Sequence, residues 1–147
     1  MSLRARRIFP VLALAALLVA ALPACAPAPA TSGLHMMSMD QMPAEVQAAP
    51  ASVRTAYQFA AANPDVMQHI PCYCGCGGIG HESNYDCYVA DVEASGTVRF
   101  DGHALGCSIC VDITQDAMRL LREGKSVPEI RSYVDATYSR YGTSNMQ

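Results

Sequence analysis

Apolar residues recur at helical spacing in two segments of the C-terminal third of the chain. In the first segment the spacing i, i+3, i+7 and i+11 holds for Cys110, Ile113, Ala117 and Leu121, and Gly124 ends the pattern. In the second, a capping-box pair precedes an apolar stripe; the pair is Ser126 and Glu129, and the stripe is Ile130, Tyr133, Val134, Tyr138 and Tyr141. The pattern predicts two amphipathic helices, the second of which ends at Gly142.

A further helix is predicted over residues 52–62, where Val53, Ala56, Tyr57 and Ala60 share a face and Asn63-Pro64 ends the periodicity. Residues 71–83 are rich in Cys and Gly and predict a loop, and weak alternation around Gly96 in residues 88–100 is compatible with a short β-hairpin. The expected fold is therefore a small, mainly α-helical domain over residues 51–142 with a central Cys/Gly-rich loop region, followed by a tail over residues 143–147.

The N-terminus has the pattern of a lipoprotein signal peptide. Arg4, Arg6 and Arg7 precede an apolar run over residues 11–22, which is too short for a transmembrane helix of about 20 residues. The following Leu22-Pro23-Ala24-Cys25 resembles the lipobox of bacterial lipoproteins. We therefore expect a signal peptide over residues 1–24, a lipidated Cys25 and a membrane-anchored, extracytoplasmic protein. The alternative is an ordinary secretory peptide in which Cys25 has no role.

Residues 25–50 are rich in Met, Pro and Ala and predict a flexible tether between the lipid and the domain. Removal of the signal peptide takes away three arginines and leaves seven basic against thirteen acidic residues, a net charge of −6. With Lys125 as its one lysine and without a basic cluster, the chain is not expected to bind nucleic acid.

Six of the seven cysteines lie in one central stretch and predict a single site or framework: Cys72, Cys74, Cys76, Cys87, Cys107 and Cys110. A disulfide within a Cys-x-Cys unit is strained, whereas thiolates at that spacing converge readily on a soft metal ion. Cys107 and Cys110 lie one turn apart at a predicted helix start, where the helix dipole favours thiolate. His81 and His103 lie in the same stretch and are candidate imidazole ligands.

These residues resemble the PCYCGC-motif lipoproteins, a bacterial family of anchored, cysteine-rich proteins regarded as metal-binding. The resemblance rests on residues 71–77, Gly80-His81, Ser83-Asn84, Asp86-Cys87 and residues 103–112. It implies that the six cysteines, His81 and His103 are family positions.

The favoured ion is Cu(I), with Zn(II) or an iron–sulfur cluster as alternatives. Six thiolates exceed what one tetrahedral zinc needs, whereas Cu(I) forms multinuclear thiolate clusters. A secondary, weaker set of ligands is expected in the tether, where thioethers and one imidazole gather: His35, Met36, Met37, Met39 and Met42. The alternative for this set is a compositionally biased linker.

Two other readings of the cysteines remain open. Outside the cytoplasm, six cysteines in a small domain commonly form three disulfides, here joining the Cys-x-Cys-x-Cys run to Cys87, Cys107 and Cys110. A thiol–disulfide redox domain is the second. The favoured function is sequestration of a metal ion or its delivery to a metal-accepting protein, and no enzymatic activity is expected.

Overall fold

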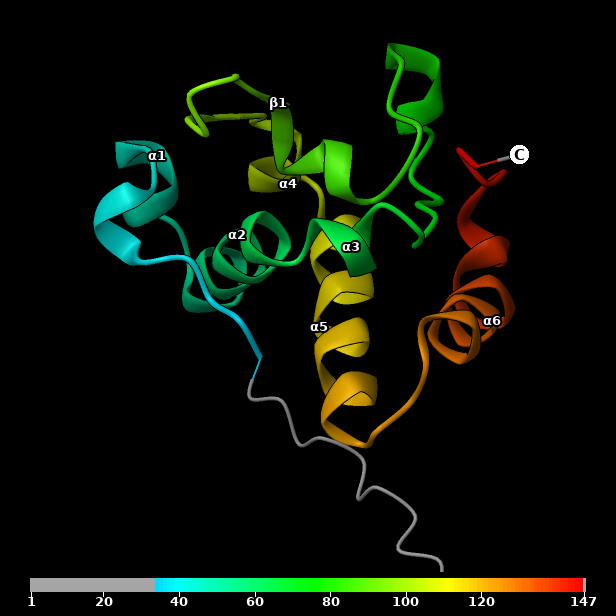
Figure 1. The fold of residues 1–147 in the computed structure, drawn as a ribbon. Coiled ribbons are helices and arrows are strands. Elements are labelled where there is room, and N and C mark those ends of the chain that lie inside the picture. The colour runs from blue at the N-terminus through cyan, green and yellow to red at the C-terminus, as the bar shows by residue number, and fades with distance from the viewer. Residues whose placement is uncertain (1–33, 147) are drawn as a thin grey trace, which may run out of the picture.

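The computed structural model describes residues 34–146, which form a mainly helical domain with one two-stranded antiparallel hairpin (Figure 1). The α-helices are α1 (Ala44–Gln47), α2 (Ala51–Ala62), α3 (Pro64–Met67), α4 (His103–Gly106), α5 (Ser108–Arg122) and α6 (Val127–Tyr138). Short 3-10 turns are η1 (Met39–Gln41), η2 (Cys76–Ile79), η3 (Tyr85–Cys87) and η4 (Ser139–Tyr141), and the strands are β1 (Val89–Val92) and β2 (Val98–Phe100). The predicted fold class is confirmed.

The predicted signal peptide and the lipidation site Cys25 lie outside the described residues. Within residues 34–146, no helix has both the length and the apolar character needed to cross a membrane.

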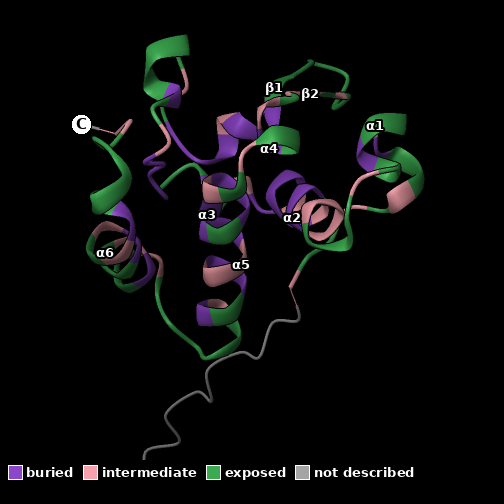
Figure 2. Cartoon of the chain, turned by 180° about the vertical axis from the view of Figure 1, so that it is seen from behind, coloured by how far each residue is buried: buried purple, intermediate pink, exposed green. Residues whose placement is uncertain are grey.

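Helix α5 is the central element, with α2 packed on one side and α6 on the other (Figure 1). Cys110, Ile113 and Ala117 of its predicted stripe are fully buried, whereas Leu121 is half-buried near the end of the helix. Val111, Thr114 and Met118 widen the buried face, because α5 has neighbours on two sides and a single narrow stripe would not cover both (Figure 2). The buried face begins in the first turn of α5, so Cys110 lies deep in the molecule.

Helix α6 begins with the predicted capping box of Ser126 and Glu129, and buries Ile130, Val134 and Tyr138. The prediction that Tyr133 and Tyr141 belong to the buried stripe is wrong, because their side chains are 37% and 51% exposed. Tyr133 lies at the edge of the stripe, where the Arg119 guanidinium stands 5.3 Å from its ring centre. Tyr141 follows the end of α6, so helical periodicity no longer sets its direction.

The part of the expected tether that the structure describes, residues 34–50, is packed onto the domain. Met37 exchanges two hydrogen bonds with Gln58 of α2: its N–H donates to the Gln58 carbonyl at 2.9 Å and its carbonyl accepts from Gln58 Nε2 at 2.8 Å. Met42 and Val46 are buried in the hydrophobic core. Residues 34–50 are therefore not the flexible tether that the sequence predicted. Met42 and Val46 lie four residues apart and form an apolar face that anchors the segment, and the prolines and polar residues around them made this face hard to recognise in the sequence.

The hairpin connects the cysteine loop to α4. Val92 pairs with Val98 and Val89 with Phe100, with an irregularity in register between Val89 and Asp91. Gly96 makes the turn with a φ of 86°, a left-handed conformation that glycine adopts without a steric penalty. Because β2 ends three residues before α4 begins, His103 is carried back towards the cysteines.

Candidate metal centre

Three segments bring the six central cysteines together at the N-terminal end of α5. The segment from the loop after α3 to the start of η2 supplies Cys72, Cys74 and Cys76, η3 supplies Cys87, and the N-cap and first turn of α5 supply Cys107 and Cys110. All six are free thiols, and no disulfide joins them within residues 34–146. The six cysteines therefore converge as their spacing predicted. They do not form the disulfide framework that was the alternative.

One group of ligands, here called the outer group, consists of Cys74, His103, Cys107 and Cys110, whose ligand atoms all lie within 4.8 Å of one another. Cys74 Sγ lies 3.3 Å from His103 Nε2 and 3.6 Å from Cys110 Sγ. A tetrahedral ion with metal–sulfur bonds of about 2.3 Å holds its sulfurs about 3.8 Å apart, and a sulfur and an imidazole nitrogen about 3.6 Å apart. The outer group therefore needs little adjustment to bind one metal ion.

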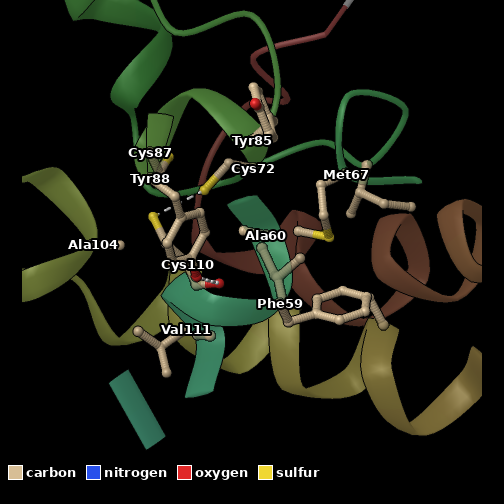
Figure 3. Close-up of a cluster of buried hydrophobic side chains, with 14 of the residues drawn as sticks. Phe59, Ala60, Met67, Cys72, Tyr85, Cys87, Tyr88, Ala104, Cys110 and Val111 are labelled. Carbon is tan, nitrogen blue, oxygen red and sulfur yellow. Dashed lines mark hydrogen bonds between the residues drawn. The ribbon is translucent and has the colours of Figure 1, made fainter. Parts of the chain in front are cut away.

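The second group, here called the inner group, consists of Cys72, Cys76 and Cys87, whose sulfurs also lie within 4.8 Å of one another. Cys76 Sγ and Cys87 Sγ are 3.7 Å apart, and all three residues are at most 2% exposed. Figure 3 shows Cys72 and Cys87 among the core side chains near Tyr85 and Tyr88. The inner group is thus a set of three soft donors within the hydrophobic core.

The two groups touch through Cys72. Its sulfur lies 3.4 Å from Cys110 Sγ and 3.4 Å from Cys74 Sγ, both members of the outer group. These separations are far longer than a disulfide bond of about 2.05 Å, so they are contacts between thiols. The six sulfurs therefore form one continuous cluster rather than two distant sites.

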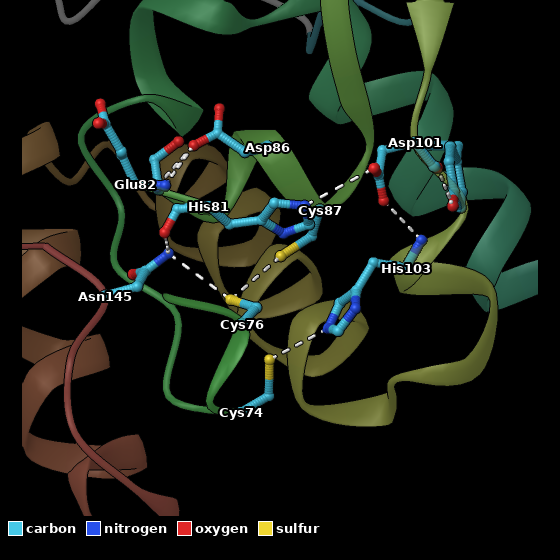
Figure 4. A network of polar contacts seen from close by, with 11 residues as sticks. Cys74, Cys76, His81, Glu82, Asp86, Cys87, Asp101, His103 and Asn145 are labelled. Atoms are coloured by element: carbon cyan, nitrogen blue, oxygen red, sulfur yellow. Dashed lines mark hydrogen bonds and ion pairs between the residues drawn. The ribbon is translucent and has the colours of Figure 1, made fainter. Parts of the chain in front are cut away.

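Gly75 separates neighbouring cysteines into different groups. Its φ of 87° lies in the left-handed region, where a residue with a Cβ is strained. The reversal at Gly75 leaves Cys74 facing His103, while Cys76 faces Cys87 on the inner side (Figure 4). The Cys-Gly-Cys sequence thus serves two groups, which the spacing alone did not predict.

The packed thiols shift one another's pKa values in opposite directions. The pKa of Cys72 is lowered, chiefly because the thiol of Cys110 and then those of Cys76 and Cys87 donate hydrogen bonds to its sulfur. The pKa of Cys110 is raised by its bond to Cys72, and that of Cys87 by its bonds to Cys110 and Cys72. One thiolate is therefore stabilised at the expense of its neighbours, and a cation that engages all six sulfurs displaces protons.

Of the two predicted imidazole ligands, His103 joins the outer group and His81 belongs to neither group. His81 lies beside His103, with ring centres 5.3 Å apart, and its Nε2 is 3.6 Å from Asp101 Oδ2.

The expected secondary ligand His35 belongs to neither group, and its carbonyl accepts from Asn63 Nδ2 at 2.8 Å at the junction of α2 and α3. His35 and Met36 are exposed, and Met37 and Met39 are half-buried against the core. Met42 is 4% exposed, so its thioether packs within the core rather than with the exposed side chains of this segment.

Asn145 is the important contact residue that sequence reasoning missed. Its Oδ1 accepts from Cys72 N–H at 2.6 Å, and its N–H donates to the Cys72 carbonyl at 3.1 Å. Its Nδ2 is 3.6 Å from Cys76 Sγ and donates to the His81 carbonyl at 3.2 Å. The predicted tail thus carries a side chain that holds the inner group, and no periodicity or motif marks that role.

A buried polar network supports Cys110 from behind. Its carbonyl accepts hydrogen bonds from Tyr88 Oη at 2.8 Å and from Thr114 Oγ1 at 3.0 Å, and Thr114 Oγ1 also lies 3.0 Å from Asn84 Oδ1. Tyr88, Thr114 and Asn84 are fully buried. The network fixes the first turn of α5, from which Cys110 contacts both groups.

The geometry therefore places Cys/His donors where they can bind a metal ion. No curated protein and no solved structure matches the chain significantly. Residues 33–145 match a family described as proteins of unknown function with a PCYCGC motif, and the motif itself is residues 71–76. Because the match spans nearly all of the described domain, the chain belongs to the PCYCGC-motif family.

Proposed function

We propose that this protein binds soft metal ions, with Cu(I) as its physiological cargo, through the six-sulfur cluster. The observation that carries the proposal is the contact of Cys72 with sulfurs of the outer group while it belongs to the inner group. A thiolate in that position bridges two ions, and bridging thiolates are characteristic of multinuclear Cu(I) sites. Hard cations such as Mg²⁺ and Ca²⁺ require oxygen ligands and are poor candidates for such a cluster.

Zn(II) is the main competitor of Cu(I). The outer group alone offers three sulfurs and one nitrogen, a common donor set for structural zinc. One Zn(II) in the outer group uses only three of the six thiols, whereas a Cu(I) cluster uses all six. The number of sulfurs and the contact between the two groups through Cys72 therefore favour copper. The donor set of the outer group taken alone favours zinc.

The proposed biological role is sequestration of the metal ion or its delivery to a metal-accepting protein at the extracytoplasmic side of a membrane. The basic residues and apolar run before Cys25 support export and lipid anchoring. We propose a binding protein rather than an enzyme, because the donor groups suffice for ligation and form no pattern that activates a nucleophile. Nucleic acid is not a proposed partner.

The test is a competition titration of reduced protein spanning residues 26–147, which omits the signal peptide and the lipid-bearing cysteine. Under anaerobic conditions, Cu(I) is added in the presence of a chromophoric Cu(I) chelator, and Zn(II) in a parallel series with a zinc chelator. We expect tight binding of more than one Cu(I) per chain and of at most two Zn(II) ions, one for each group. A Cys74→Ser, Cys107→Ser double variant should lose the outer site.

The unfavourable outcomes are distinct. Reduced protein that fails to compete with the chelator for either ion would refute the proposal. Isolation of the protein with three stable disulfides and no metal would instead support the disulfide framework. For the anchor, mass spectrometry of the membrane-bound protein should find lipid on Cys25, and Cys25→Ser should release the chain from the membrane fraction.

A further inference from the structure

We infer that His81 is the fourth ligand of the inner group, binding through Nδ1, so that the domain contains two adjoining centres of three sulfurs and one nitrogen each. The ligand class is a thiophilic d¹⁰ cation, Cu(I) or Zn(II). This inference rests on the proposed function and deepens it by completing the inner centre.

The first observation is an orphaned nitrogen. His81 Nδ1 is buried without a hydrogen-bond partner, and it is the one buried side-chain nitrogen or oxygen in residues 34–146 in that condition. The side chain as a whole is 11% exposed, so water does not readily replace the missing partner. Buried polar atoms are nearly always paired, and an unpaired one in a native fold requires an explanation.

The second observation indicates which of the two His81 ring nitrogens carries the free lone pair. His81 Nε2 faces the Asp101 carboxylate, at 3.6 Å from Oδ2. In a neutral imidazole the nitrogen that faces a carboxylate carries the proton, and the other nitrogen is an acceptor. Nδ1 is therefore a buried acceptor. No donor reaches it, and a bare imidazole lone pair beside thiols can instead be donated to a metal ion.

The third observation is position. The His81 N–H donates to the Cys76 carbonyl at 3.3 Å, so the histidine is tied to an inner-group cysteine through its backbone. Figure 4 shows the His81 ring beside the Cys76–Cys87 pair, with Asp101 on its far side. As the structure holds it, His81 stands outside the inner group, so binding requires its side chain to rotate until Nδ1 reaches an ion held by Cys72, Cys76 and Cys87.

Asp101 acts as a positioning residue for both histidines. Its Oδ1 accepts the His103 N–H at 2.7 Å, and its Oδ2 faces His81. Its own backbone is fixed at both ends, because its N–H donates to the Tyr88 carbonyl at 2.9 Å and its carbonyl accepts from Tyr57 Oη at 2.7 Å. A carboxylate that orients a ligating imidazole is the usual arrangement behind metal-bound histidines.

The experiment counts imidazoles per metal ion by X-ray absorption spectroscopy of residues 26–147 loaded with Zn(II), and separately with Cu(I). The variants are His81→Gln, His103→Gln and the double variant. The exposed His69 provides the matched control, His69→Gln. With Zn(II) we expect two ions and one imidazole per ion in the wild type, half of that signal in each single variant, and none in the double variant. Asp101→Asn should weaken binding by about 10- to 100-fold.

The Zn(II)-loaded and Cu(I)-loaded samples show which of the two ions the histidine binds. An imidazole signal with Zn(II) but not with Cu(I) assigns the completed centre to zinc, and a signal with both assigns it to either ion. Retention of the full imidazole count in metal-loaded His81→Gln would overturn the inference while leaving the proposed function intact. Absence of binding in the wild type would overturn both.

A measurement on the wild type covers the case in which His81→Gln does not fold. Nitrogen-15 spectra of the histidine rings should show His81 Nδ1 shifting on metal addition, with the proton retained on Nε2. An unshifted Nδ1 in the fully loaded protein would overturn the inference, whatever the behaviour of the variants.

Discussion

Single side chains decide how the inner group is held. Asn145 reaches back to the cysteine loop and makes contacts with Cys72, Cys76 and the His81 carbonyl. An amide N–H directed at a sulfur stabilises the thiolate that binds a metal, in the manner of contacts behind metal ligands.

Asn145→Ala should therefore weaken metal binding by the inner group by roughly 10-fold and leave the outer group unchanged. Chelator competition at stepwise metal loading separates the two groups. Thr143→Ala is the control, since Thr143 is an exposed neighbour in the same tail. Equal affinities of the two variants would show that the Asn145 contacts have no effect on the metal.

Thr114 offers a test of the network behind Cys110. Thr114→Val removes a hydroxyl whose single proton is shared between two buried acceptors, Asn84 Oδ1 and the Cys110 carbonyl, so the free energy of unfolding should fall by about 1–3 kcal/mol. Thr55→Val is a matched control, because Thr55 makes the same bond to the carbonyl four residues earlier at an exposed site. Urea denaturation of the reduced, metal-free proteins measures both, and equal losses would contradict the prediction.

At the scale of elements, the loop between α3 and η2 must reverse at Gly75. Gly75→Ala places a Cβ on a residue with a φ of 87°, which costs roughly 1–2 kcal/mol in the left-handed region. We expect weaker binding of metal to both groups, because Cys74 and Cys76 lie on either side. Gly78→Ala is the control, since a Cβ there meets open space and φ is not positive. Similar affinities for the two variants would argue against a role for the reversal.

The start of α6 provides a test that is independent of the cysteines. Ser126 N–H and Oγ both donate to Glu129 Oε2, at 2.9 and 2.7 Å. Ser126→Ala should lower the free energy of unfolding by about 1 kcal/mol at neutral pH.

The same cap predicts a pH dependence. The pKa of Glu129 is lowered, first by the Ser126 hydroxyl and then by its backbone N–H. The contribution is therefore present above the unfolded pKa of about 4.3 and is lost as pH falls through the lower folded value. The difference between wild type and Ser126→Ala should shrink between about pH 6 and about pH 3 in urea titrations. A constant difference would show that the carboxylate takes no part.

At the scale of the whole molecule, the sequence predicted what periodicity and local chemistry determine. The stripe of α5, the capping box of α6 and the hairpin around Gly96 are local patterns, and the structure contains all three. Packing of residues 34–50 was not predictable, because Met42 and Val46 are buried only where α2 offers a partner surface. Convergence of the cysteines followed from their types and spacing, but their division into two groups depends on the reversal at Gly75 and on Asn145, which is distant in sequence.

Metal binding should also stabilise the fold as a whole. Binding to the folded state alone raises the free energy of unfolding by about 2.7 kcal/mol when the free ion is 100 times its Kd. Calorimetry with buffered Cu(I) or Zn(II) should therefore raise the melting temperature of the reduced protein, and Mg²⁺ at the same free concentration should not. Identical shifts with Mg²⁺ would point to a general ionic effect rather than to the cysteines.

The unequal burial of the two groups also ranks the thiols by their exposure to chemical damage. Cys74 and Cys107 are half-buried, whereas Cys72, Cys87 and Cys110 have no exposed surface. Oxidation to sulfenic acid requires access to the sulfur, so peroxide and alkylating reagents meet Cys74 and Cys107 first. Cys74 and Cys107 therefore act as the sacrificial layer of the cluster, and the buried thiols, which include Cys110 of the outer group, are the last to be lost.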